Sequence, residues 1–239
     1  MDRVSINKAR TIYYGMFASL FAFSFSESHY NKIIKAVDIL SASPLDDDSG
    51  KALVTMKAIL ETSTYKTVKD ESDMVFFSPT TSFIPMTASY YDEQRDDGKK
   101  RVAMMNFVFQ SKFRRNTDVF KENEDHIEFI SLFMQRLIEE EICGQEGSDV
   151  IVRNVFENVI NPMIDHMSKQ LFNHENGVLY KQSAIVLDSF ASFERLFFDV
   201  SKCVVDENRN TASPNIKPRK IKKAPRKLIE RNLDEFVSI

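Results

Sequence analysis

The sequence predicts an all-helical protein, a single globular bundle of several helices followed by a basic C-terminal extension. Three observations favour this fold class. Glycine and proline, which shape turns and end helices, number only 6 and 7 in 239 residues. Apolar residues recur at three- and four-residue spacing along most of the chain, which is the period of a helix with one buried face. Hydrophobic residues make up 43% of the chain, enough for a core.

Three helices are predicted in the first third of the chain. The first spans about residues 6–25, the second follows an N-cap at Ser28, and the third follows an acidic loop at residues 41–50. Their inward faces are expected to consist of Ile12, Met16, Leu20 and Phe23, then Ile33, Ile34, Val37 and Leu40, then Leu53, Met56, Ile59 and Leu60. Residues 74–86 are apolar but contain two prolines, so we expect an extended segment laid across the helical body, with two short strands as the alternative.

Five further helices are predicted in the rest of the domain. An apolar stripe from Ile127 to Ile138 marks the most apolar of them, and Gly144 stands where this helix is expected to stop. Asn161 followed by Pro162 predicts a fresh helix start, with the asparagine as N-cap and the proline at the first helical position. The other three are a helix through residues 104–108, one opened by Ser148 or Asp149, and a last one over residues 178–203.

Residues 206–239 differ in character from the predicted helical domain of residues 1–205. Seven basic residues fall between 217 and 227, and without them the formal net charge of −3 becomes −10, so the domain is acidic and the tail basic. Apolar residues after 227 predict a short amphipathic helix at the end of a linker. The tail has three interpretations. It is a plain linker, a segment that binds nucleic acid or an anionic membrane, or one that folds onto the acidic domain of its own or a neighbouring chain, giving self-association.

Sequence motifs for catalysis are absent. The chain has no phosphate-binding glycine loop, no nucleophile elbow and no HExxH zinc helix. His126 and Glu128 form the HxE of zinc deaminases, but the partner PCxxC is missing. Two distant cysteines predict no disulfide and fit a reducing compartment. We therefore expect a cytoplasmic protein with no catalytic residues, metal or cofactor. We expect no stable membrane insertion, since the apolar stretch of residues 12–25 is shorter than the roughly 20 residues that span a bilayer.

A dense polar cluster, ENEDH at residues 122–126, directly precedes the most apolar predicted helix. The simplest interpretation is capping, in which Asn123 or Asp125 accepts backbone N–H groups and the acids favour the positive end of the helix. The cluster also resembles the E-P-x-D-H motif of the TorD/DmsD/NarJ-type redox-enzyme maturation chaperones, with Asn123 in place of the usual proline. Other blocks are similar to that family in the same order: Arg10, Tyr13, Tyr14, Leu20 and Phe21, then Pro85, Ser89 and Tyr91, then Phe133 and Met134, then Tyr180.

That resemblance implies an all-helical TorD-like bundle and a chaperone rather than an enzyme. Members of the family bind the twin-arginine signal peptide, or another part, of a molybdenum oxidoreductase and retain it in the cytoplasm until cofactor insertion and folding are complete. The implied partner is such a signal peptide or the apo form of the catalytic subunit, with formate dehydrogenase as the expected client. Guanine nucleotide binding is suggested for some members, but this sequence has no nucleotide motif.

A twin-arginine signal joins a basic region to an apolar one, so its receptor needs acidic groups beside an apolar groove. The predicted signal-peptide-binding residues are the acidic Glu122, Glu124, Asp125 and Glu128, the neighbouring His126, and an upstream set of Phe76, Phe77, Phe83, Pro85, Met86, Ser89 and Tyr91. The alternative function is a helical nucleic-acid-binding regulator acting through residues 217–227, although the acidic domain argues against wider contact with phosphates. A metal-dependent hydrolase is the third hypothesis.

Overall fold

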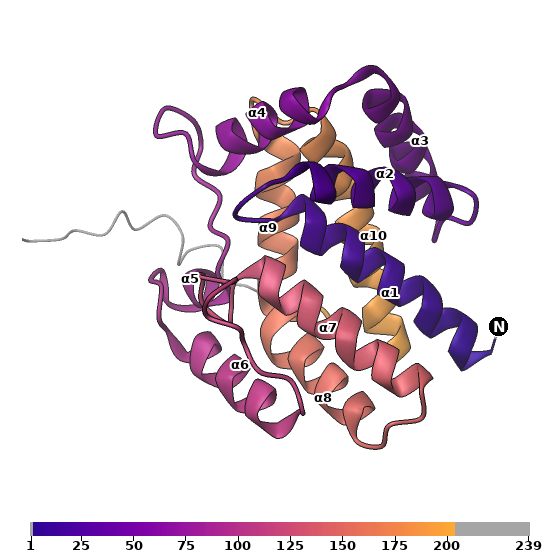
Figure 1. Cartoon of the computed structure of the whole chain (residues 1–239), viewed down its shortest axis with the longest axis vertical. Coiled ribbons are helices and arrows are strands. Elements are labelled where there is room, and N and C mark those ends of the chain that lie inside the picture. The colour runs from indigo at the N-terminus through magenta and orange to yellow at the C-terminus, as the bar shows by residue number, and fades with distance from the viewer. Residues whose placement is uncertain (1, 204–239) are drawn as a thin grey trace, which may run out of the picture. The chain divides into compact units, whose positions relative to one another are not determined.

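The computed structural model describes residues 2–203, which form ten α-helices and one π-helical turn (Figure 1). The only β-type pairing in this part of the chain is a single bridge between Thr87 and His126, so the predicted all-helical bundle is confirmed. The elements in chain order are α1 (Arg3–Leu20), α2 (Glu27–Ser41), α3 (Asp47–Thr62), α4 (Tyr65–Phe76), α5 (Ala88–Glu93), α6 (Lys99–Gln110), α7 (Ile127–Ile142), α8 (Ser148–Val155), η1 (Phe156–Ile160), α9 (Asn161–Asn173) and α10 (Leu179–Phe198).

Side-chain caps fix where the early helices begin. At the start of α3 the Asp46 carboxylate accepts the Ser49 N–H at 2.7 Å, as the acidic loop before this helix suggests. At the start of α2 the N–H of Ser26 donates to Nδ1 of His29 at 3.1 Å. The predicted cap at Ser28 is therefore wrong, because the histidine three residues after Ser26 closes a capping box and places the helix start earlier.

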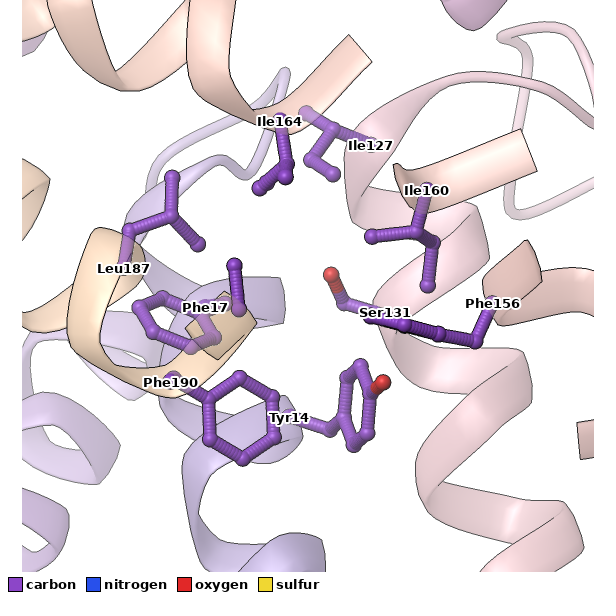
Figure 2. A pocket seen from close by; sticks show the side chains of 10 residues that line it. Tyr14, Phe17, Ile127, Ser131, Phe156, Ile160, Ile164, Leu187 and Phe190 are labelled. Carbon is purple, nitrogen blue, oxygen red and sulfur yellow. The ribbon is translucent and has the colours of Figure 1, made fainter. Parts of the chain in front are cut away.

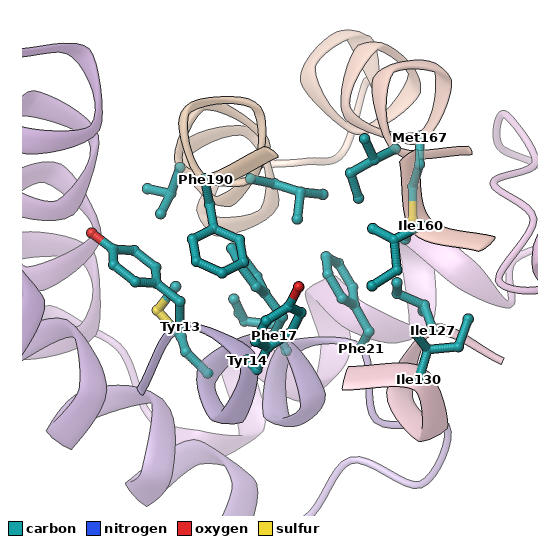
Figure 3. Packing of buried hydrophobic residues seen from close by; sticks show 14 of the residues in the cluster. Tyr13, Tyr14, Phe17, Phe21, Ile127, Ile130, Ile160, Met167 and Phe190 are labelled. Atoms are coloured by element: carbon teal, nitrogen blue, oxygen red, sulfur yellow. The ribbon is translucent and has the colours of Figure 1, made fainter. Parts of the chain in front are cut away.

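The core of the bundle is built around α1, which packs against α2 and α7. Long side chains of α1 also reach α10. Tyr13 and Tyr14 of α1 contact the ring of Phe190 in α10, with centroids 4.9 and 5.0 Å apart. Phe17 contacts the same ring at 5.6 Å. Isoleucines of α7 and η1 close the other side of this cluster (Figure 3). Burial of these apolar faces, at roughly 1.5–3 kcal/mol per large side chain, is the main stabilisation of the bundle.

A buried ion pair joins α1 to α10 inside this core. The Arg10 guanidinium donates to both carboxylate oxygens of Glu194, at 2.6 and 2.9 Å, and both side chains are almost fully buried. The Tyr14 hydroxyl donates to the same carboxylate at 2.8 Å, and the Asn7 side-chain oxygen accepts from Arg10 at 2.8 Å. The guanidinium also lies over the Phe197 ring, 4.3 Å from its centroid. The pair is thus supported by hydrogen bonds and a cation–π contact, which a buried charge requires.

α9 begins at Asn161 as predicted, but the predicted cap there is wrong, because α8, η1 and α9 form one continuous helical run. Pro162 removes a backbone donor, and the run accommodates it with the π-helical turn η1, in which the Asn161 N–H donates to the carbonyl of Phe156, five residues back. The Asn161 side chain therefore caps nothing. Its amide donates to the Ser201 carbonyl at 2.9 Å and its oxygen accepts from Nε of Arg195 at 2.7 Å, which ties α9 to α10 and the segment after it.

Other helix boundaries differ from the predicted ones for local reasons. α1 ends at Leu20, and the chain after it turns so that Phe23 is about half exposed rather than part of an inward face. α4 was not predicted as a separate helix, and it enters the segment of residues 74–86 that was expected to be extended, because the prolines that exclude a helix begin only at Pro79. The short helix α5 was not predicted. α10 ends at Phe198, since the following residue has a left-handed backbone conformation with φ 53°.

No helix within residues 2–203 has both the length and the hydropathy needed to cross a bilayer. The predicted basic linker and terminal amphipathic helix, residues 206–239, lie outside the described residues.

Candidate functional site

The candidate site is centred on the motif loop, residues 122–126, which leads into α7 and holds the start of α5. The Ile127 N–H donates to the Met86 carbonyl at 2.8 Å, and the Ala88 N–H donates to the Asp125 carbonyl at 2.9 Å. The Asp125 carboxylate is fully buried and accepts the Ser89 N–H at 2.9 Å through Oδ2. Two segments that are almost 40 residues apart in the sequence are therefore fastened together by backbone and side-chain hydrogen bonds.

His126, rather than Asn123 or Asp125, caps α7, so the predicted capping residue is wrong. Its Nδ1 accepts the N–H of Glu128 at 3.3 Å. The Asp125 carboxylate is unavailable for this role because it is turned toward Ser89. Asn123 donates its side-chain amide to Asp97 at 3.3 Å instead. The acidic contribution to the first turn of α7 comes from Glu128.

The His126 ring is buried and carries no charge near neutral pH. Burial disfavours the imidazolium and lowers the pKa of His126 to about 4. Because Nδ1 acts as an acceptor, the proton of the neutral ring is on Nε2, and this buried donor has no hydrogen-bond partner within residues 2–203. One oxygen of the neighbouring Asp125, Oδ1, is likewise buried without a partner there. Buried polar atoms without a hydrogen-bond partner are uncommon in native proteins, and each one needs an explanation.

Glu124 is already neutralised by two arginines. Its carboxylate forms ion pairs with Nε of Arg101 at 3.0 Å and with Nε of Arg115 at 3.1 Å. Arg115 also donates to the backbone carbonyl of Glu122. This arrangement anchors the motif loop to α6 and to the segment before the loop, and it leaves little of the Glu124 charge for a ligand.

Glu122 and Glu128 differ from Glu124 because neither forms an ion pair within residues 2–203. Glu128 is buried and accepts the Phe23 N–H at 2.8 Å. Burial raises the pKa of Glu128 to about 6, the charge of Glu122 adds to the effect, and the Phe23 N–H and Lys32 oppose it. Burial, and then the charge of Asp96, raises the pKa of Glu122. Two adjacent carboxylates with raised pKa values form a site that a cation would stabilise.

An aromatic row, defined as Phe77, Phe23, Phe120 and Phe129, runs past these carboxylates. Phe77 and Phe23 are about half exposed, and their rings meet edge to face at 5.3 Å. The centroid of the His126 ring lies 6.3 Å from that of Phe23 and 6.1 Å from that of Phe120. Phe120 continues the row to Phe129 of α7 at 5.4 Å. An apolar surface therefore lies beside acidic groups, and three of its four residues were not among those predicted.

Of this row, only Phe77 was among the predicted site residues. Phe23 was assigned to an inward helix face because its spacing continues the apolar period of α1, and only the end of that helix at Leu20 frees it. Phe120 precedes the motif in the sequence and Phe129 follows it. That proximity to the motif was the sequence feature from which these two residues could have been predicted.

The predicted residues upstream of the motif take different positions. Phe83 is well exposed and meets the ring of Tyr90 at 5.5 Å, whereas Phe76 and Pro85 are buried and Met86 is half buried. The Tyr91 hydroxyl lies 2.9 Å from the Pro85 carbonyl and 3.0 Å from Oε1 of Gln170. The buried Ser89 hydroxyl accepts the N–H of Arg101 at 3.2 Å. These residues shape the segment before α5, and Phe83 is the one that offers a large exposed apolar surface.

The described residues contain no metal-binding group, and the cavity found in their core is small. No cluster of three or more histidine, cysteine or acidic side chains is arranged to hold a metal within residues 2–203. A cavity of about 20 Å³ lies between α1, α7, η1, α9 and α10 and has almost entirely apolar walls (Figure 2). It is lined by Tyr14, Phe17, Ile127, Ser131, Phe156, Ile160, Ile164, Leu187, Phe190 and Ala191. That volume holds about one water molecule, so the cavity is a packing void of the core.

Comparisons with known proteins agree with this fold and with the earlier resemblance. The family model described as nitrate reductase delta subunit matches residues 42–169, which is more than half of the chain and includes the motif loop. A crystal structure of a proposed redox enzyme maturation protein from Archaeoglobus fulgidus is similar with a TM-score of 0.50 at 17% identity, over 77% of this chain and 93% of that one. This structural likeness supports a shared fold. No curated protein sequence matches the chain. The chain therefore belongs to the nitrate reductase delta subunit family, which comprises the NarJ- and TorD-type redox-enzyme maturation chaperones.

Proposed function

We propose that this protein is a non-catalytic maturation chaperone that binds the twin-arginine signal peptide, or the apo form, of an exported molybdenum oxidoreductase. Family membership supports the general role. The observation that carries the specific one is the position of the aromatic row beside Glu122 and Glu128, two carboxylates without an ion-pair partner within residues 2–203.

The chemistry of the ligand matches both parts of this surface. A twin-arginine signal has a basic region followed by an apolar one. A guanidinium can pair with a carboxylate through two parallel hydrogen bonds, which Glu122 and Glu128 would accept. The apolar region would lie on the aromatic row, where Phe23 and Phe77 are about half exposed. Binding would thus relieve the repulsion between the two carboxylates and remove exposed aromatic surface from water.

The remaining predicted residues have supporting roles in this proposal. Asp125 and Ser89 hold the loop against the start of α5, and Glu124 holds it against Arg101 and Arg115. His126 keeps the loop in shape by capping α7, and its Nε2–H is a donor for a carbonyl of the bound peptide. Pro85, Met86 and Tyr91 position the segment that carries Phe83. We place the exposed Phe83 ring as a second apolar contact for the peptide.

The proposed client is an enzyme that is exported after its cofactor has been inserted, with formate dehydrogenase as the first choice. Retention of such a client before export requires the chaperone to act in the cytoplasm, which is where we place this protein. We also propose that residues 1–205 are the binding domain and residues 206–239 an accessory tail, whose basic and then apolar order imitates a signal peptide. Deletion of residues 214–239 should then raise affinity for the client peptide, and unchanged affinity would exclude this self-inhibition.

Isothermal titration of the purified chain with synthetic signal peptides tests the main proposal. The panel contains twin-arginine leaders of a formate dehydrogenase and of a nitrate reductase, each also with both arginines changed to alanine. Binding should require the arginines and should weaken in Glu122→Gln and Glu128→Gln. Phe77→Ser should weaken it as well, and Phe172→Ser on α9 is the matched control, because the two phenylalanines are 43% and 42% exposed.

Two outcomes would contradict the proposal. One is the absence of binding to every leader, with or without residues 214–239. The other is binding that survives the loss of both peptide arginines and of both carboxylates, since recognition would then depend on apolar contact elsewhere.

A further inference from the structure

Helix α6 is apolar on two sides. Met104 and Val108 face the bundle and are buried, whereas Val102, Met105 and Phe109 are 57%, 48% and 77% exposed. The exposed three lie three, four and seven residues apart, so they form one stripe along the outer face of the helix. α6 lies at the edge of the bundle, where its neighbours are α5, α8 and η1 (Figure 1). A helix that is apolar on both faces is usually covered on both, and this outer stripe is covered by none of the described residues.

The segment around α6 is also strongly basic in an acidic chain. Residues 98–117 contain six cations and no acid, while the whole chain has a formal net charge of −3. Ion pairs to Glu93, Asp97, Glu124 and Glu140 offset part of this charge. Within residues 2–203, Lys100 and Arg114 bond to backbone carbonyls rather than to acids. The Arg114 guanidinium lies 5.6 Å from the centroid of the Phe109 ring, so positive charge stands directly beside the exposed stripe.

We propose that the outer face of α6 is a membrane-surface site, at which the stripe of Val102, Met105 and Phe109 enters the interface of an anionic bilayer. A helix with an apolar face bordered by lysine and arginine binds in the plane of such an interface, and each cation near the surface adds attraction to anionic headgroups. The contact is reversible and shallow, because three apolar side chains do not anchor a protein permanently. This function is separate from peptide binding and would bring the chaperone to the surface across which its client is exported.

The shape and charge of this face favour a lipid surface over two other occupants. A peptide helix docks into a groove between elements, whereas the stripe is a ridge on a single helix. In a symmetric pairing of two copies through α6, the cations beside each stripe would face one another and repel. A bilayer interface accommodates a ridge and has the opposite charge.

The absence of tryptophan from the chain allows a direct test, because a single introduced tryptophan reports only on its own position. The full chain carrying Phe109→Trp is mixed with vesicles of phosphatidylglycerol and phosphatidylcholine, or of phosphatidylcholine alone. We expect a blue-shifted emission, and quenching by brominated acyl chains, with the anionic vesicles only. Leu196→Trp is the control, since Leu196 is 84% exposed on α10 and away from the stripe. Its emission should not change.

Vesicle flotation of the otherwise unmodified chain supplies the second measurement. Val102→Ser combined with Phe109→Ser should lower the fraction bound to anionic vesicles about tenfold, and Leu196→Ser should leave it unchanged. Both changes are at exposed positions, so the unfolding midpoints should match that of the wild type. The proposal is overturned if the chain does not bind anionic vesicles. It is also overturned if the chain floats while the Phe109→Trp emission stays unshifted, because the basic residues 217–227 or another surface would then be responsible.

Discussion

The Asp125 carboxylate accepts the backbone N–H of Ser89 at 2.9 Å, and both residues are fully buried. This contact joins the motif loop to the first turn of α5, which follows the segment that carries Phe83. An acidic motif residue that looked available for a cationic ligand is therefore a structural acceptor. Of the four acids predicted to bind the ligand, Asp125 is thus held by Ser89, and Glu124 is paired with two arginines. Glu122 and Glu128 form no ion pair within residues 2–203, and Glu128 accepts the Phe23 N–H.

Asp125→Ala should destabilise the fold, because it leaves the buried N–H of Ser89 without its acceptor. A loss of about 1–3 kcal/mol in the free energy of unfolding is expected. Urea titration followed by far-UV circular dichroism measures it. Asp118→Ala is the nearby control, since Asp118 is exposed and should change stability by less than about 0.5 kcal/mol. Equal effects of the two substitutions would mean that the loop does not depend on this contact.

Glu194→Ala should be more damaging, because it leaves the Arg10 guanidinium charged and buried without its partner. We expect a loss of about 3–5 kcal/mol in the free energy of unfolding. The double variant Arg10→Met with Glu194→Leu removes both charges and should recover much of that loss. Arg3→Ala, which breaks an ion pair with Glu141 at an exposed position, should cost less than about 1 kcal/mol. A loss of less than about 1 kcal/mol in Glu194→Ala would show that water or another group compensates the Arg10 charge.

His126 should make the fold less stable in mild acid. Its pKa is about 4 in the folded state against an ordinary value of 6.5, so the unfolded chain binds the proton more readily between these values. Its contribution is therefore fully present above pH 6.5 and decreases as the pH falls toward 4, by roughly 3 kcal/mol at most. Urea titrations at pH 7 and pH 4.5 should show a smaller difference in His126→Gln than in the wild type.

The neighbouring Glu128 requires a control in that experiment. Its raised pKa has the opposite sign, because stability from this group is present below pH 4.5 and is lost as the pH rises through about 6. The comparison should therefore be repeated with Glu128→Gln in both proteins. If the pH dependence of stability is the same with and without His126 in that background, the ring is not buried as the structure has it.

Peptide binding should strengthen as the pH rises from 5 to 7, if the proposed function is correct. An arginine of the peptide needs an ionised carboxylate, and a Glu128 pKa of about 6 leaves only about a tenth of that group ionised at pH 5. We expect roughly tenfold weaker binding at pH 5 than at pH 7 in isothermal titrations, and a flatter profile in Glu128→Gln. His126 does not confuse the result, because its pKa near 4 keeps it neutral over this range. A flat profile in the wild type would remove Glu128 from the binding site.

The sequence predicted the helices of this protein well where their apolar period was long, and less well where a partner from elsewhere sets the boundary. The stripe from Ile127 to Ile138 became α7, with nearly the predicted bounds. Phe23 continues the period of α1, yet its N–H is bound by Glu128, more than a hundred residues later in the chain, and the helix has already ended. Asn161 has the residue type of a cap, but contacts with Arg195 and Ser201 decide its role.

The sequence by itself determined the helical class, most of the faces that enter the core and the place of the motif before α7, because helix period and turn composition act over a few residues. Tertiary structure alone decided which acids of that motif are neutralised and which aromatic rings are exposed. The reason is physical: a carboxylate is neutralised only where an arginine or a buried N–H approaches within about 3 Å, and such approaches depend on how distant helices pack. The Glu124 carboxylate pairs with Arg101 and Arg115, whereas the Glu122 carboxylate pairs with neither and Arg115 reaches only its backbone carbonyl, although only one residue separates these two acids in the chain.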